Sequence, residues 1–202
     1  MPSEGVPYPL FAYAALLPWT FFSTGVSNAT GSLVNHTALI TKVYFPREIL
    51  PITYVIAALF DFVIGLAALA ALMVWYQVPI TPAVLYLVPV VALLAAWILA
   101  VTLLTSAAQV RWRDVGVAMP VFVQILMFVS PVIYPLGLVD AWRSWYLLNP
   151  MAGIINAFRD VLLRAQFPEL VPLAYSAAVT AVALPLAYIV FKRAEATMAD
   201  IV

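Results

Sequence analysis

The chain has 202 residues, a formal net charge of zero, 66% hydrophobic residues and only 9% charged residues. A water-soluble domain covers its surface with more polar groups than this, so the composition excludes a soluble globular protein. The long apolar runs indicate an all-α membrane protein. The balanced charge argues against nucleic acid as a partner. The sequence contains no cysteine, which excludes disulfides, thiolate metal sites and cysteine nucleophiles.

Five apolar blocks predict five transmembrane helices within a single domain, residues 1–202. The blocks cover about residues 8–40, 52–77, 83–108, 115–130 and 170–191. The second block has about 26 residues and would extend ~39 Å as a helix, enough to cross a hydrocarbon core of ~30 Å. Its one charged residue is Asp61. An acidic residue inside a span has three explanations: it serves the protein's function, it forms a hydrogen bond within the helix bundle, or its carboxyl group is protonated.

Residues 41–51 form a charged segment between the first two apolar blocks. Pro46 and Pro51 lie five residues apart, and each proline interrupts a helix, so one continuous helix is not expected there. The apolar and charged side chains predict a short separate helix, Tyr44 to Leu50, lying on the membrane boundary and offering charges to a partner. A cytoplasmic loop that only sets topology is the alternative.

The segment 136–169 carries charged residues between apolar runs that are too short to cross a membrane. These residues are Asp140, Arg143, Arg159, Asp160 and Arg164. With the prolines at 131, 135 and 150, this spacing predicts a re-entrant helical hairpin rather than another crossing. Asn149 and Pro150 suit a helix start, with the asparagine as the cap.

Basic residues indicate the orientation of the spans. Six cations fall on one side of the predicted topology: Lys42, Arg47, Arg111, Arg113, Lys192 and Arg193. Positive residues near span ends favour the cytoplasm, so this side is expected to be cytoplasmic and the hairpin lies outside. Residues 134–146, also expected on the outer side, include Tyr134, Trp142, Trp145 and Tyr146. These aromatics belong either to an interfacial belt or to a surface that faces substrate.

Seven short motifs in this order resemble permease subunits of ABC exporters for polysaccharide, O-antigen and teichoic acid. They are Tyr8-Pro9-Leu10-Phe11, Trp19-Thr20-Phe21-Phe22, the charged segment, Asp61-Phe62, Arg113-Asp114, Ser130-Pro131-Val132-Ile133-Tyr134-Pro135 and Leu148-Asn149-Pro150-Met151. The resemblance implies a six-span subunit of the bacterial inner membrane that forms a homodimer around a channel and pairs with separate ATPase subunits. It also implies that ATP and magnesium bind to the partner, and that this chain is not an enzyme and has no cofactor.

The resemblance implies roles for particular residues. The ATPase-coupling set is Lys42, Tyr44, Phe45, Arg47 and Glu48. A second cytoplasmic contact, or merely an anchor on that side, would be Arg111, Arg113 and Asp114. Candidates for the outer gate or channel are Tyr134, Trp142, Trp145, Tyr146 and Arg159. Since this chain begins near the family's second span, we expect it to lack the amino-terminal interfacial helix and the first span.

Other functions and sites are weighed against this interpretation. A membrane-embedded enzyme acting on lipid-linked sugars would need converging acids and bases, but the acids are scattered along the chain. An ABC permease for another lipid or for a drug stays open. His36 has no second metal ligand at helical spacing and is interpreted as a polar contact at a helix end. The sequence also lacks a glycine-rich phosphate loop ending in lysine and serine or threonine.

Overall fold

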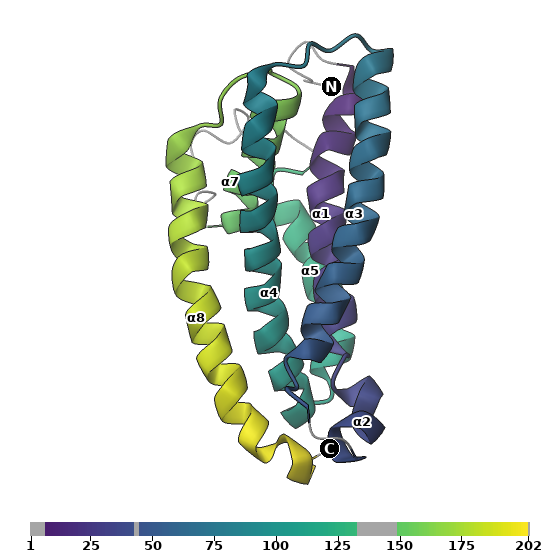
Figure 1. The fold of residues 1–202 in the computed structure, drawn as a ribbon, viewed down its shortest axis with the longest axis vertical. Coiled ribbons are helices and arrows are strands. Elements are labelled where there is room, and N and C mark those ends of the chain that lie inside the picture. Colours follow the sequence, from purple (N-terminus) through teal and green to yellow (C-terminus); the bar gives the residue numbers. More distant parts are fainter. Residues whose placement is uncertain (1–6, 43–44, 133–148, 202) are drawn as a thin grey trace.

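The computed structural model describes residues 7–42, 45–132 and 149–201, and these residues form helices and connections without a strand. The elements are α1 (Tyr8–Thr30), η1 (Val34–His36), α2 (Thr37–Lys42), α3 (Ile49–Trp75), η2 (Pro82–Tyr86), α4 (Leu87–Arg111), α5 (Val115–Val129), α7 (Pro150–Leu162) and α8 (Leu170–Ile201). Figure 1 shows an elongated bundle in which α1, α3, α4 and α8 run along the long axis. The prediction of an all-α membrane protein is confirmed.

Four helical stretches are long and apolar enough to cross a membrane: Tyr8–Thr30, Ile49–Trp75, Pro82–Arg111 and Leu170–Ala196. The fourth predicted block forms α5, whose 15 residues would extend only ~22 Å. In Figure 1, α5 occupies the lower half of the bundle and α7 the upper half. The helix α5 ends at Val129. Ser130 after it has an extended backbone, because it precedes Pro131 and the residue before a proline disfavours helical backbone angles.

Helix α1 is the central helix of the bundle. It contacts α3, α4, α5 and α7. In its most apolar window, 61% of the residues are buried, compared with 17% in α8. Phe11, Phe21 and Val26 are among its fully covered side chains. Helices α3, α4, α5 and α7 therefore pack around α1, while α8 packs against α4 and α7. The outer faces of α3, α4, α5 and α8 are exposed to lipid or to other protein surfaces.

Helix α7 packs closely against α8 near the upper end of the bundle, where Gly153 of α7 faces Pro172 and Ser176 of α8. A Cβ atom at Gly153 would lie 2.4 Å from the carbonyl oxygen of Pro172 and 2.3 Å from Ser176 Oγ. Ser176 Oγ donates hydrogen bonds to the carbonyls of Pro150 (2.9 Å) and Pro172 (3.0 Å). Only glycine permits this close approach.

The prediction of a separate helix from Tyr44 to Leu50 is wrong for residues 45–50. Phe45 and Pro46 have no regular structure, Arg47 and Glu48 form a turn, and Ile49 already begins α3. Pro51 is the third residue of α3, where the backbone N–H has no partner within the helix, so a proline there costs no hydrogen bond. The short helix in this region is α2, which precedes the charged segment's prolines.

Candidate functional site

The charged segment is attached to the last helix by a polar network of four side chains. Lys192 Nζ of α8 forms ion pairs of 2.8 Å with Glu48 and with Glu195. The backbone N–H of Arg47 donates to Glu195 Oε1 over 3.2 Å, and its guanidinium donates to the carbonyl of Glu195. We call Arg47, Glu48, Lys192 and Glu195 the α8 clamp. It joins the two parts of the chain at the lower end of the bundle.

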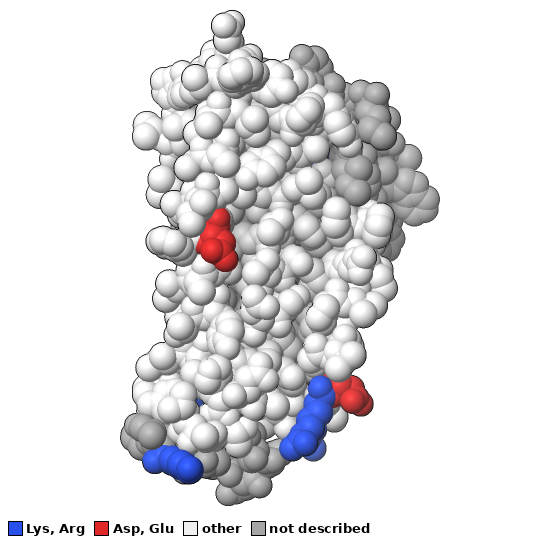
Figure 2. Space-filling view, turned by 90° about the vertical axis from the view of Figure 1, so that its right-hand side faces the viewer, with Lys and Arg blue, Asp and Glu red and all other residues white. Residues whose placement is uncertain are grey.

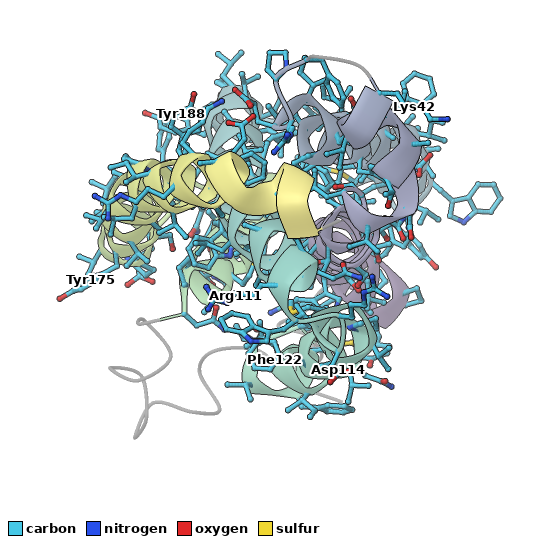
Figure 3. All side chains as sticks on the ribbon, turned by 90° about the horizontal axis from the view of Figure 1, so that it is seen from below. Lys42, Arg111, Asp114, Phe122, Tyr175 and Tyr188 are labelled. Atoms are coloured by element: carbon cyan, nitrogen blue, oxygen red, sulfur yellow. The ribbon has the colours of Figure 1, made fainter. Side chains whose placement is uncertain are left out.

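The α8 clamp changes the interpretation of the predicted coupling residues. Arg47 and Glu48 are half-buried and bind α8, so they are not simply free charges awaiting a partner. Lys42 ends α2 and is exposed, and Figure 3 shows its side chain pointing away from the bundle at this end. Phe45 is half-buried, and Tyr44 lies outside the described residues.

Sequence reasoning missed the roles of Lys192 and Glu195. It treated Lys192 only as a topogenic charge. The available signal was their spacing, because residues three apart on a helix are neighbours and opposite charges at that spacing pair. What the spacing could not reveal is the contact with Glu48, which is 144 residues away along the chain.

Arg111 and Arg113 lie at the same end of the bundle but line different pockets. Arg111 faces a mostly apolar groove of about 640 Å³ between α4 and α8, which Arg193 also lines. Its guanidinium lies 5.6 Å from the ring centre of Trp112. Figure 3 shows Arg111 beside α4 and Asp114 at α5, so the structure does not gather the predicted second contact into one patch.

A second pocket at this end, of about 350 Å³, is lined mainly by polar residues, and we call it the polar pocket. Its polar side chains come from four elements and one connection: Ser27 and Asn28 of α1, Asn35 of η1, Tyr54 of α3, Gln109 of α4, and Arg113. Nearby, a ring nitrogen of His36 lies 2.9 Å from the carbonyl of Ser32, which fits the prediction of a helix-end contact.

At the upper end, Arg159 of α7 is buried, with 2% of its surface exposed. It donates hydrogen bonds to the carbonyls of Pro131 (2.8 Å) and Val132 (2.7 Å), and its guanidinium lies 3.9 Å from the ring centre of Phe11. Arg159 stays a prediction as a channel or gate side chain, and in this structure its guanidinium contacts protein. It fixes the end of α5 and faces protein, because its donors satisfy carbonyls that no longer lie in a helix.

Further polar contacts stabilise the two ends of α7. Asn149 accepts a hydrogen bond from the N–H of Met151 (3.1 Å), which confirms the predicted cap, and its amide donates to Ser130 Oγ (2.8 Å). Asp160 pairs with Arg164 and accepts from the amide of Asn156 (3.1 Å). The aromatic gate candidates lie outside the described residues: Tyr134, Trp142, Trp145 and Tyr146.

Asp61 lies halfway along α3 and faces out of the bundle. Figure 2 views the side on which α3 lies and shows an acidic patch at mid-height, surrounded by uncharged surface, with basic side chains and a second acidic patch at the lower end. Asp61 makes no hydrogen bond or ion pair with another residue that the structure describes, so the predicted hydrogen bond within the bundle is not supported. A carboxylate at this depth requires a polar neighbour or a proton.

The long apolar helices and the charges at their ends define a multi-pass membrane protein. The family model described as ABC-2 type transporter matches residues 3–163. The chain belongs to this family and is a membrane transporter, which confirms the resemblance seen in the sequence.

Curated relatives carry informative names. The chain is 32% identical to the O-antigen export system permease protein RfbA of Myxococcus xanthus over 98% of its own length and 77% of the relative's. It is 22% identical to a protein of the same name from Klebsiella pneumoniae, over 77% of this chain and 61% of that protein. It is 23% identical to the polysialic acid transport protein KpsM of Escherichia coli, over 96% of this chain and 76% of KpsM.

Proposed function

We propose that this chain is the permease subunit of an ABC exporter that moves polysaccharide or a lipid-linked glycan out across the bacterial inner membrane. The observation that carries the proposal is the match to an O-antigen export permease along 98% of the chain. The similarity to a polysialic acid transport protein supports a glycan as the substrate. A separate ATPase subunit binds ATP and magnesium and supplies the energy.

The coupling of ATP hydrolysis to export runs through the lower end of the bundle. The ATPase docks on the charged segment, where Lys42 is exposed, and moves it. The α8 clamp then passes this motion to α8, because two carboxylates of the clamp hold Lys192 at once. Helix α8 packs against α7 at Gly153, and Arg159 of α7 holds the end of α5. These contacts connect the cytoplasmic end with the outer end without a break.

The channel forms between two copies of the permease. Helix α5 supports this part of the proposal, because Val117, Val121, Phe122 and Ile125 are exposed on a helix too short to serve as an ordinary lipid-facing span. Figure 3 shows Phe122 on the outer side of α5. A second copy would cover this face and enclose a path for the glycan.

Deletion of the gene followed by complementation tests the proposed function. The deletion should abolish surface glycan and leave glycan inside the cell, and the wild-type gene should restore export. Phe45→Ala should restore it only weakly while the protein still inserts, since an ATPase contact depends on a few packed aromatic and charged side chains. Gln166→Leu, a change of one exposed side chain at the opposite end, is the control and should behave as wild type. Normal surface glycan in the deletion strain would contradict the proposal.

A further inference from the structure

We propose that the polar pocket is a binding site for the sugar hydroxyls of the exported glycan at the cytoplasmic entrance of the permease. The inference rests on the proposed function and assigns part of its substrate recognition to named residues. The pocket volume of about 350 Å³ falls within the range of small-ligand sites, ~300–1,000 Å³. The six polar side chains named above face it from elements that are far apart in the sequence.

One buried polar group of the pocket, the side-chain amide oxygen of Gln109, is not used to hold the fold together. Gln109 is 9% exposed, and its buried amide oxygen has no hydrogen-bond partner among the residues that the structure describes. Among the buried hydroxyls that the structure describes, Thr30 Oγ1 donates to Val26 (2.7 Å) and Ser106 Oγ to Leu103 (3.3 Å), whereas Ser32 Oγ, like the Gln109 oxygen, has no partner. Of these two orphaned oxygens, only that of Gln109 belongs to a residue that lines the polar pocket. A buried acceptor without a partner is costly, so its presence in a pocket indicates a ligand that donates to it.

The shape of the polar pocket depends on Gly116, because the side chain of Gln109 occupies the space that a larger residue at position 116 would fill. A Cβ atom at Gly116 would come within 2.2 Å of Gln109 Nε2 and 2.9 Å of its amide carbon. The amide therefore lies directly against the first turn of α5. Any side chain at position 116 would push the amide away from its present position.

The chemistry of the lining favours sugar over a lipid tail. Amides and hydroxyls both donate and accept hydrogen bonds, as sugar hydroxyls do, and the ring of Tyr54 adds a flat apolar face. Among the described residues that line the pocket, Arg113 is the one with a charged side chain, so the pocket accepts neutral or acidic sugars. In a membrane protein, polar groups without protein partners face water or a polar ligand. The polar pocket lies at the end of the bundle that carries the cationic side chains. Positive residues favour the cytoplasmic side, so a glycan that enters from the cytoplasm would meet the pocket first.

Glycan binding by the purified permease and ATPase complex tests the inference. The probe is the glycan that accumulates inside cells lacking the permease gene, purified and fluorescently labelled. Gln109→Leu should weaken binding about tenfold while leaving thermal stability unchanged, because the amide makes no hydrogen bond that the fold would lose. Gly116→Ala should weaken binding without removing a polar group. Gln166→Leu makes the same change at an exposed position at the opposite end and should bind as wild type.

Each result separates the inference from its alternatives. Wild-type affinity in the Gln109→Leu complex would overturn the inference while leaving the proposed function intact. So would an equal loss in Gln166→Leu, or a loss of thermal stability in Gln109→Leu, because these indicate a general or structural effect. Absence of glycan inside cells that lack the gene would instead contradict the proposed function, and the inference would fail with it.

Discussion

Arg159→Met should destabilise the permease by about 2–4 kcal/mol. The carbonyls of Pro131 and Val132 would each lose a donor, which costs ~1–3 kcal/mol per buried group, and the contact with the ring of Phe11 contributes ~2 kcal/mol. Removing a buried cation also removes its desolvation penalty, which offsets part of the loss. The substitution is destabilising overall, because the two carbonyls lie in a buried stretch, where Val132 is fully covered and water cannot replace the lost donors.

Thermal and denaturant unfolding of the purified protein in detergent would measure this effect. Arg193→Met is the matched control, because Arg193 is exposed and makes no ion pair with a described residue. The control should change stability by less than ~0.5 kcal/mol. If the two variants are equally stable, the assignment of Arg159 as the anchor of α5 is refuted.

Three further changes have defined outcomes. Gly153→Ala should cost ~1–3 kcal/mol in unfolding, since its Cβ overlaps atoms of α8, and wild-type stability would refute the close packing. Lys192→Glu should lower glycan export while the ATPase stays bound in pull-downs. Adding Glu48→Lys to this variant should restore part of the export, because the ion pair is re-formed with its charges exchanged. If the double variant does not recover export, the α8 clamp is not a coupling element. Asp61→Leu should leave unfolding stability within ~0.5 kcal/mol, whereas a loss above ~2 kcal/mol would reveal a partner in the chain.

The spans and the start of α7 could be predicted from the sequence because they follow from local physics. Apolar runs of sufficient length form helices in lipid, and Asn149 followed by Pro150 has the chemistry of a helix start. Pro51 was misjudged because a proline breaks a helix interior but is tolerated in the first turn. Choosing between these two positions requires knowing where the helix begins.

The partners of Arg47, Glu48 and Arg159 could not be predicted, because they depend on contacts between distant parts of the chain. Arg159 has the residue type of a channel or substrate contact, yet it binds carbonyls of the connection after α5. Arg47 was expected to meet another protein and meets Glu195 of α8 instead. Gln109 attracted no notice in the sequence, because an amide near a span end is common and only its missing partner makes it informative.

ATP-driven movement of glycan in reconstituted vesicles tests the central claim most directly. The permease and its co-purified ATPase would be placed in liposomes, with the glycan from cells lacking the permease gene and ATP supplied on the side that the ATPase faces. The account predicts that labelled glycan enters the lumen, where an added glycosidase cannot reach it, and that Lys192→Glu reduces this transfer while the ATPase remains bound. Hydrolysis of ATP without protected glycan in wild-type vesicles would contradict the account.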